Sequence, residues 1–116
     1  MSIIIERPPI RVDEEFQITI YLHRPTNLSD IKAWRFPWAA DITNVKSICD
    51  SGSITFTGGI DGVDLGGTAN SVSTTEDSED HSSANSGTEG DYFTWSGTSN
   101  SLCKEAVITV TGVRTA

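Results

Sequence analysis

Side chains that alternate between apolar and polar with a period of two restrict the fold of this chain more than any other feature. The alternation is clearest in EEFQITIYLHR, residues 14–24, and in EAVITVTGVRT, residues 105–115. It predicts half-buried strands, because successive side chains of a strand point to opposite faces of its sheet. The apolar positions of the two segments are Phe16, Ile18, Ile20 and Leu22, and Ala106, Ile108 and Val110.

Turn-forming residues divide the rest of the chain into similarly short segments. Pro25, Asn27 and the pair Ser51-Gly52 favour chain reversal, and five glycines lie within residues 58–68. Helix signals are almost absent, and we expect at most one helical turn, around residues 76–80. About seven to eight short strands predict an all-β fold, either an antiparallel β-sandwich or a jelly roll.

The stretch SVSTTEDSEDHSSANSGTEGDYFTW, residues 71–95, departs most from this pattern. Between Ser73 and Asp91 it contains one apolar residue, Ala84. Only 25 residues follow Asp91, which is too few for a second domain. We therefore predict one β-sandwich domain over residues 13–116, in which residues 73–91 form a long, exposed polar loop between two strands.

The opening segment MSIIIERPPIRV has a character of its own. Ile3, Ile4 and Ile5 suit strand pairing, whereas the Pro8-Pro9 pair cannot donate hydrogen bonds to a sheet. We predict an extended N-terminal arm over residues 1–12. Two interpretations are open: an arm that docks on a neighbouring subunit, or an edge strand of the chain's own domain.

The charge of the chain is acidic and uneven. The net charge is -8, with -1 in residues 1–60 (seven acids, six bases) and -7 in residues 61–116 (nine acids, two bases). Such a surface repels a phosphate backbone, so we expect no direct nucleic-acid partner. MSIII is too short for a signal peptide, and no run approaches the roughly 20 apolar residues of a membrane span. We expect synthesis in a host cytoplasm and no membrane partner.

Residues that could carry chemistry are few. The histidines His23 and His81 are far apart in the sequence, and the acidic run at residues 76–80 lacks the ligand spacing of a calcium loop. Cys49 and Cys103 do not form a CxxC motif, and they are interpreted as two buried thiols or, alternatively, as a disulfide. We predict no catalytic, cofactor-binding or metal-binding residues, and no enzyme activity.

An aromatic set occurs in AWRFPWAADI, where Trp34, Phe36 and Trp38 fall on one face of a strand. Three large aromatic side chains at this spacing bury a large apolar area, roughly 150–250 Å² each. Three interpretations are open: part of the core, a subunit interface, or a stacking surface for carbohydrate.

The order of these features resembles small all-β domains of tailed-bacteriophage virions, found in capsid decoration (cement) proteins and in fibre or appendage proteins. The resemblance lies in AWRFPWAADITNVKS, in the stretch SVSTTEDSEDHSSANSGTEGDYFTW and in EAVITVTGVRT, and it spans residues 16–115. It implies a non-enzymatic structural protein of the virion. Because the chain has room for one domain, a decoration protein on the capsid surface is favoured over a tail fibre or appendage module that binds a receptor or glycan.

The resemblance also implies partners. A decoration protein binds the major capsid protein, bridges neighbouring capsid subunits and is often a homo-oligomer, with a trimer favoured here. The expected contacts are the N-terminal arm and one sheet edge, to which a strand can be added. Arg7 and Arg11 would pair with capsid carboxylates. The predicted interface residues are Ile3, Ile4, Ile5, Arg7, Arg11, Trp34 and Trp38.

Overall fold

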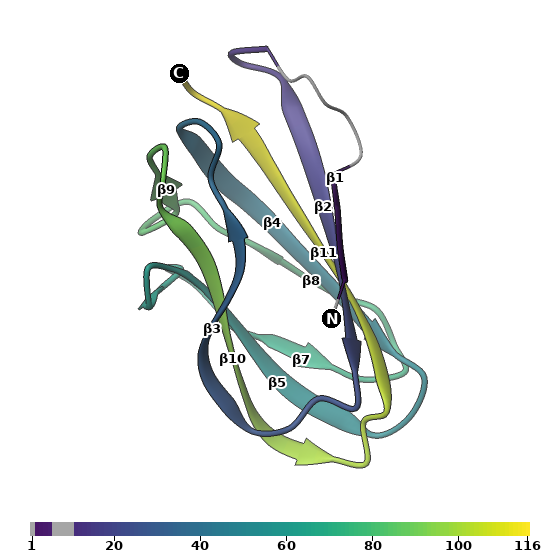
Figure 1. Cartoon of the computed structure of the whole chain (residues 1–116). Coiled ribbons are helices and arrows are strands. Elements are labelled where there is room, and N and C mark those ends of the chain that lie inside the picture. The colour runs from purple at the N-terminus through teal and green to yellow at the C-terminus, as the bar shows by residue number, and fades with distance from the viewer. Residues whose placement is uncertain (1, 6–10) are drawn as a thin grey trace.

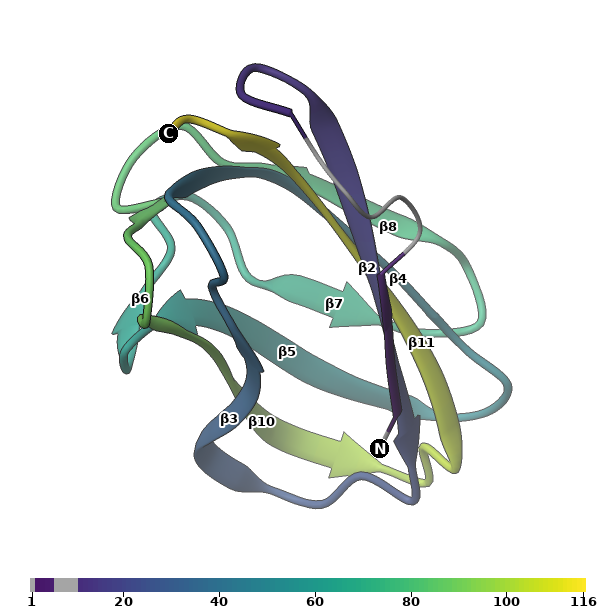
Figure 2. The ribbon, with the colours of Figure 1, turned by 45° about the horizontal axis from the view of Figure 1, so that its top comes forward.

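The computed structural model describes residues 2–5 and 11–116, and within them the chain forms two antiparallel sheets packed as a β-sandwich (Figures 1 and 2). The described residues contain eleven strands and no helix, so the predicted all-β sandwich is confirmed. The strands are β1 (Ser2–Ile5), β2 (Glu15–His23), β3 (Leu28–Arg35), β4 (Ala40–Cys49), β5 (Ser53–Ile60), β6 (Val63–Asp64), β7 (Asn70–Val72), β8 (Asp77–Asp80), β9 (Ser86–Gly87), β10 (Tyr92–Ser101) and β11 (Glu105–Arg114).

The first sheet has the order β1-β2-β11-β4-β8, with β9 also paired to β4, and the second has the order β3-β10-β5-β6, with β7 also paired to β5. β11 is central in the first sheet and places buried side chains of three strands in rows. Ile20, Ile108 and Ser47 form one row, and Ile18, Val110 and Val45 form the next. All six side chains are almost fully buried, which is what the period of two predicted for β2 and β11.

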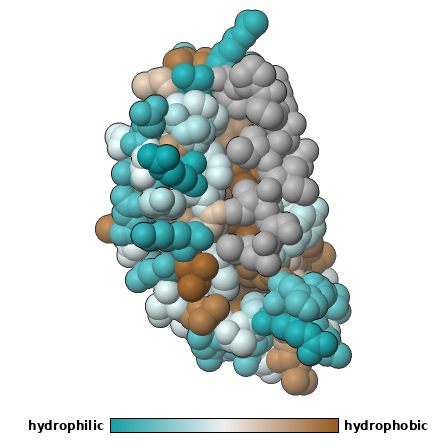
Figure 3. Space-filling view, viewed as in Figure 1, coloured by the Kyte–Doolittle hydropathy of each residue, from teal (hydrophilic) through white to brown (hydrophobic). Residues whose placement is uncertain are grey.

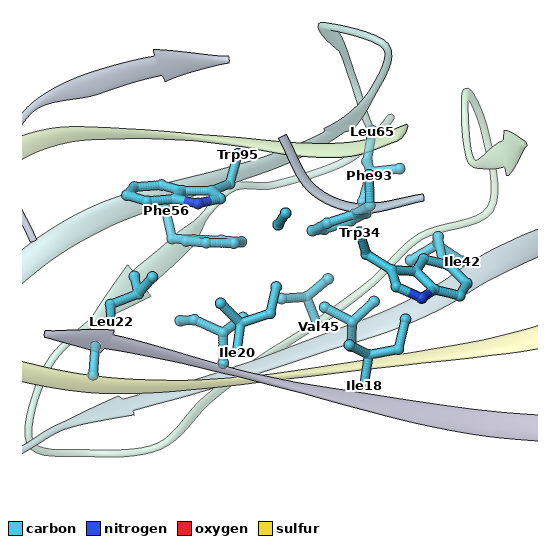
Figure 4. Packing of buried hydrophobic residues seen from close by; sticks show 14 of the residues in the cluster. Ile18, Ile20, Leu22, Trp34, Ile42, Val45, Phe56, Leu65, Phe93 and Trp95 are labelled. Carbon is cyan, nitrogen blue, oxygen red and sulfur yellow. The ribbon is translucent and has the colours of Figure 1, made fainter. Parts of the chain in front are cut away.

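The core lies between the two sheets (Figure 4). The second sheet contributes Phe56 and Trp95, whose rings stack 5.6 Å apart, and the buried Phe93. Gly112 of β11 lies against the Phe16 ring, and a Cβ at this position would come within 2.6 Å of the ring. The row that contains Phe16 therefore requires glycine on the neighbouring strand.

β4 has an irregularity at Thr43. The pairing with β11 shifts register there, since Thr111 lies opposite Asn44 while Gly112 lies opposite Ile42. Thr43 is the extra residue of a bulge. The bulge lets both Ile42 and Val45 face the core although they are three positions apart.

The polar segment 73–91 is not one long exposed loop, and this part of the prediction was wrong. Asp77–Asp80 forms β8 and Ser86–Gly87 forms β9, and both pair with the free edge of β4. Edge pairing needs backbone hydrogen bonds and no apolar side chains, so a polar sequence forms a strand here. The helical turn expected around residues 76–80 is likewise replaced by β8, which adds to the strand number above the expected seven to eight.

Three polar side chains anchor this segment to the sandwich. The buried Asn70 amide donates to the Val45 carbonyl at 2.9 Å, which joins β7 of one sheet to β4 of the other. His81 is also buried, and its Nδ1 donates to the Gly66 carbonyl at 2.7 Å. Asn85 donates to the Ile42 carbonyl at 2.7 Å. These bonds fix a segment that has almost no apolar side chains to bury.

Candidate partner interface

The N-terminal strand is the first element of the predicted interface. β1 pairs antiparallel with β2, from Ser2 opposite Tyr21 to Ile5 opposite Ile18. Of the two interpretations of the arm, the described part matches an edge strand of the chain's own sheet. Ile3 and Ile5 are in register with the buried Ile20 and Ile18, and Ile4 is in register with Thr19. Arg7 lies outside the described residues.

β1 is also the last strand of its sheet, with β2 on one side and no described strand on the other. The backbone groups of an edge strand that point away from its partner can pair with a strand of another chain. The edge of β1 is therefore a surface to which strand addition is geometrically open.

The turn before β2 lies at one end of the sandwich, at the top of Figure 1, close to the C-terminal end of the chain. The turn that carries Arg11 is held there by backbone bonds, since Asp13 N donates to Arg114 O at 2.7 Å and Glu14 N donates to Arg11 O at 3.1 Å. Arg11 is exposed, and Val12 beside it is 50% exposed. The turn therefore exposes a positive charge and an apolar side chain next to each other.

Trp38 lies at the same end, in the connection from β3 to β4. Thr115 N donates to Ala39 O, which ties this connection to the C-terminal residues. The Trp38 ring is half-buried, packs edge-on to Phe16 at 4.9 Å between ring centroids, and carries the Arg114 guanidinium 5.4 Å from its own centroid. The structure thus brings Arg11 and Trp38, 27 positions apart in the sequence, to one end of the sandwich. This surface of Arg11, Val12, Trp38 and Arg114 is called the upper-end surface below.

Trp34 lies in the core of the folded chain, so little of its surface is open to a partner, and its predicted place in an interface stays a prediction. It is 8% exposed and lies among Phe16, Phe36 and Trp38, at 5.5, 4.7 and 6.0 Å between ring centroids. The core interpretation of the aromatic set holds for Trp34 and for Phe36, which is fully buried. With Trp95 also buried, only Trp38 of the three tryptophans offers part of its ring to a ligand.

An apolar row on the outer face of the first sheet was not predicted. Tyr21, Val107 and Ile48 lie directly opposite one another on β2, β11 and β4. Tyr21 is 43% exposed and Ile48 is 39% exposed. The row continues in register to Ser2 of β1, so it runs up to the edge described above. The outward-facing positions of these strands are otherwise mostly polar and include threonine, lysine and asparagine. Tyr21, Ile48 and Val107 are exceptions among them, and this was the signal in the sequence.

Elsewhere hydrophobic side chains are scattered. In the view of Figure 3 they occur as small groups among hydrophilic residues.

A hollow of about 380 Å³ is lined in part by Ile60, Val63 and Asp91. The pKa of Asp91 is held below its ordinary value mainly by the Thr88 backbone N–H, which donates to its carboxylate at 2.9 Å. This carboxylate closes a turn, so its lowered pKa has a structural cause.

Within residues 2–5 and 11–116, no three histidine, cysteine, aspartate or glutamate side chains gather in a way that could hold a metal ion. The same residues contain no helix that could cross a membrane.

In comparisons with known proteins, no family model and no curated protein sequence matches the chain.

Proposed function

We propose that the protein is a structural component of a tailed-bacteriophage virion, a capsid decoration protein that binds the major capsid protein on the outer surface of the particle. In this role it bridges neighbouring capsid subunits and holds them together against the pressure of the packaged DNA. The proposal is for a non-enzymatic protein, without a cofactor, that acts as a homo-oligomer, with a trimer favoured.

The observation that carries this proposal is the position of β1 at the edge of the first sheet. The outer edge of β1, with which no strand of the described residues pairs, lies next to the outer row of Tyr21, Val107 and Ile48, so a backbone edge adjoins an apolar surface. A rigid particle surface offers strands and apolar side chains that fit such a combination by strand addition.

The upper-end surface supports a second contact. Arg11 is exposed at the end of an otherwise acidic protein, and the neighbouring Val12 and Trp38 add apolar area. An arginine pairs with carboxylates in a planar, bidentate geometry, which makes it suited to an acidic site on a capsid subunit. Two contact regions on one small domain are what a bridge between two subunits requires.

The test is binding to purified capsids of the phage that encodes the protein, measured by co-sedimentation with native and truncated chains. Deletion of residues 2–9 removes β1 and is expected to abolish binding, while far-UV circular dichroism still shows a β spectrum. Arg11→Glu leaves every strand in place and is expected to weaken binding more than tenfold. A deletion variant that still coats particles would contradict the role of β1.

A matched control and an oligomer measurement complete the test. Val63→Ser changes a side chain that is 63% exposed on the second sheet, at the opposite edge of the sandwich from β1, and is expected to bind as the native protein does. Solution mass at micromolar concentration, alone and with capsids, gives the number of copies in the oligomer. Specific binding on a glycan array that Trp38→Ala abolishes, together with no binding to capsids, would favour an appendage module instead.

A further inference from the structure

Cys49 and Cys103 come together at the end of the sandwich opposite the upper-end surface. Cys49 is the last residue of β4, and Cys103 lies between β10 and β11. Both are buried and both are free thiols, with exposed fractions of 6% and 5%. They are 54 positions apart in the sequence, so it is the fold that makes them neighbours.

The strand register places Cys49 at the start of β11. Ala106 lies directly opposite Cys49. The neighbouring residues Asp50 and Glu105 exchange two hydrogen bonds, since Asp50 N donates to Glu105 O and Glu105 N donates to the Asp50 carboxylate, each at 3.0 Å. Cys103 is therefore only three residues before the direct partner of Cys49.

The two turns that carry the cysteines are packed against each other. The Ser51 hydroxyl donates to the Leu102 carbonyl at 3.0 Å. At Gly52, with φ at +65°, a Cβ would lie 2.0 Å from the Ser101 carbonyl oxygen, so only glycine permits this approach. The Cys49 thiol points under the same turn, donating to the carbonyls of Ser51 and Gly52 at 3.2 and 3.4 Å.

The two thiols also influence each other directly. Burial, together with the charge and hydrogen bond of the neighbouring Cys49 thiol, raises the pKa of the Cys103 thiol to about 11. A thiol with this pKa is almost entirely protonated at neutral pH and reacts slowly. The pair is thus close enough to interact, and in the folded chain the Cys103 thiol exchanges slowly.

We propose that Cys49 and Cys103 form a dithiol site that a small disulfide oxidant, such as oxidised glutathione, converts to an intramolecular disulfide. The inference does not depend on the proposed function. It concerns the two turns, 50–52 and 101–104, that connect the first sheet to the second at this end of the molecule.

The reaction balances as two thiol–disulfide exchanges. One cysteine thiolate attacks a sulfur of oxidised glutathione, forms a mixed disulfide and releases one glutathione thiolate, which takes up the proton lost by the cysteine. The second cysteine then attacks the protein sulfur of the mixed disulfide and releases the second glutathione. The protein loses two protons and two electrons, and one oxidised glutathione takes them up to become two reduced ones.

The disulfide would join β4 to the connection between β10 and β11. Because 54 positions separate the cysteines, the cross-link restricts the unfolded chain strongly. Closing it removes the two S–H···O bonds of Cys49, which offsets a small part of the gain. The melting temperature of the oxidised chain should exceed that of the reduced chain by on the order of 10 °C.

The test is refolding of the whole chain in a buffer of reduced and oxidised glutathione. The expected product is a monomeric disulfide, lighter than the reduced chain by two hydrogen atoms in intact-mass spectrometry, with an unchanged circular dichroism spectrum and a higher melting temperature. Cys49→Ser and Cys103→Ser should each show neither the mass change nor the rise.

The proposal is overturned if both thiols stay free at an oxidising glutathione ratio, if the only disulfides are between chains, or if the oxidised chain melts no higher than the reduced one. The comparison of oxidised and reduced native chain uses one polypeptide, so it decides the question even if a serine variant does not fold.

Discussion

Asn70 is the residue whose replacement should reveal most about how the polar part of the chain is held. Its side chain is 2% exposed, and its Nδ2 lies 2.9 Å from Val45 O, 3.3 Å from Ser47 Oγ and 3.4 Å from Asp77 O. One amide thereby joins β7, β4 and β8, which belong to both sheets. We consider the variant Asn70→Ala.

The loss in the free energy of unfolding depends on which of the three acceptors can find another hydrogen-bond donor. Asp77 is half-buried, so water can hydrate its carbonyl, and the Ser47 hydroxyl can rotate. The Val45 carbonyl belongs to a residue that is 1% exposed, so water does not replace the lost amide there, and the loss of this buried hydrogen bond costs roughly 1–3 kcal/mol. With the packing lost beyond Cβ, we expect the free energy of unfolding to fall by about 2–3 kcal/mol, or the melting temperature by about 10 °C.

The assay is urea denaturation followed by tryptophan fluorescence, together with hydrogen exchange of the β8 amides. The matched control is Asn44→Ala, because the Asn44 amide donates to Ser78 Oγ and Asp80 Oδ1 at 2.9 and 2.8 Å, where both acceptors are exposed. Water can replace these bonds, so we expect a loss below about 1 kcal/mol. If Asn70→Ala costs no more than Asn44→Ala, the buried amide does not anchor the segment.

Two further changes test the core and the edge. Trp34→Ala should lower the free energy of unfolding by about 3–5 kcal/mol in urea denaturation. Trp38→Ala should lower it by clearly less, because Trp34 is buried and Trp38 is half-buried. Equal losses would contradict the core assignment of Trp34. The pKa of Glu79 is raised above its ordinary value of 4.5, mainly by a hydrogen bond with the Asp77 carboxyl. The stability that protonated Glu79 contributes is therefore fully present below pH 4.5 and is lost as the pH rises through the raised pKa. Glu79→Gln should melt above the native protein at pH 7 and lose this advantage below pH 4.5 in thermal scans; a difference independent of pH would refute it.

The elements that the sequence predicts well are those whose burial requires apolar side chains on one face. β2 and β11 bury one phase of the alternation along their whole length. Trp34 and Phe36 belong to the core for the same reason. The pattern is reliable there because the hydrophobic effect is what selects those residues.

The elements that it missed are held by hydrogen bonds. β8 reads Asp-Ser-Glu-Asp, and no periodicity of hydrophobicity marks it, because an edge strand beside β4 needs only its backbone groups to be paired. The candidate interface was predictable in part. The sequence indicated Arg11 and Trp38, but their meeting at one end depends on backbone bonds to the C-terminal residues, and the outer row of Tyr21, Val107 and Ile48 depends on register between three strands.

The antiparallel pairing of β1 with β2 has a further consequence for assembly. The hydrogen bonds of this pair are the same whether the four residues Ser2–Ile5 come from the same chain or from a second copy, so the sheet is completed equally well by exchange of the strand between molecules. Closure within one molecule needs no partner, whereas exchange becomes more populated as the local concentration of copies rises. A surface that gathers many copies in a lattice would therefore shift β1 from closing its own domain to linking it with a neighbour.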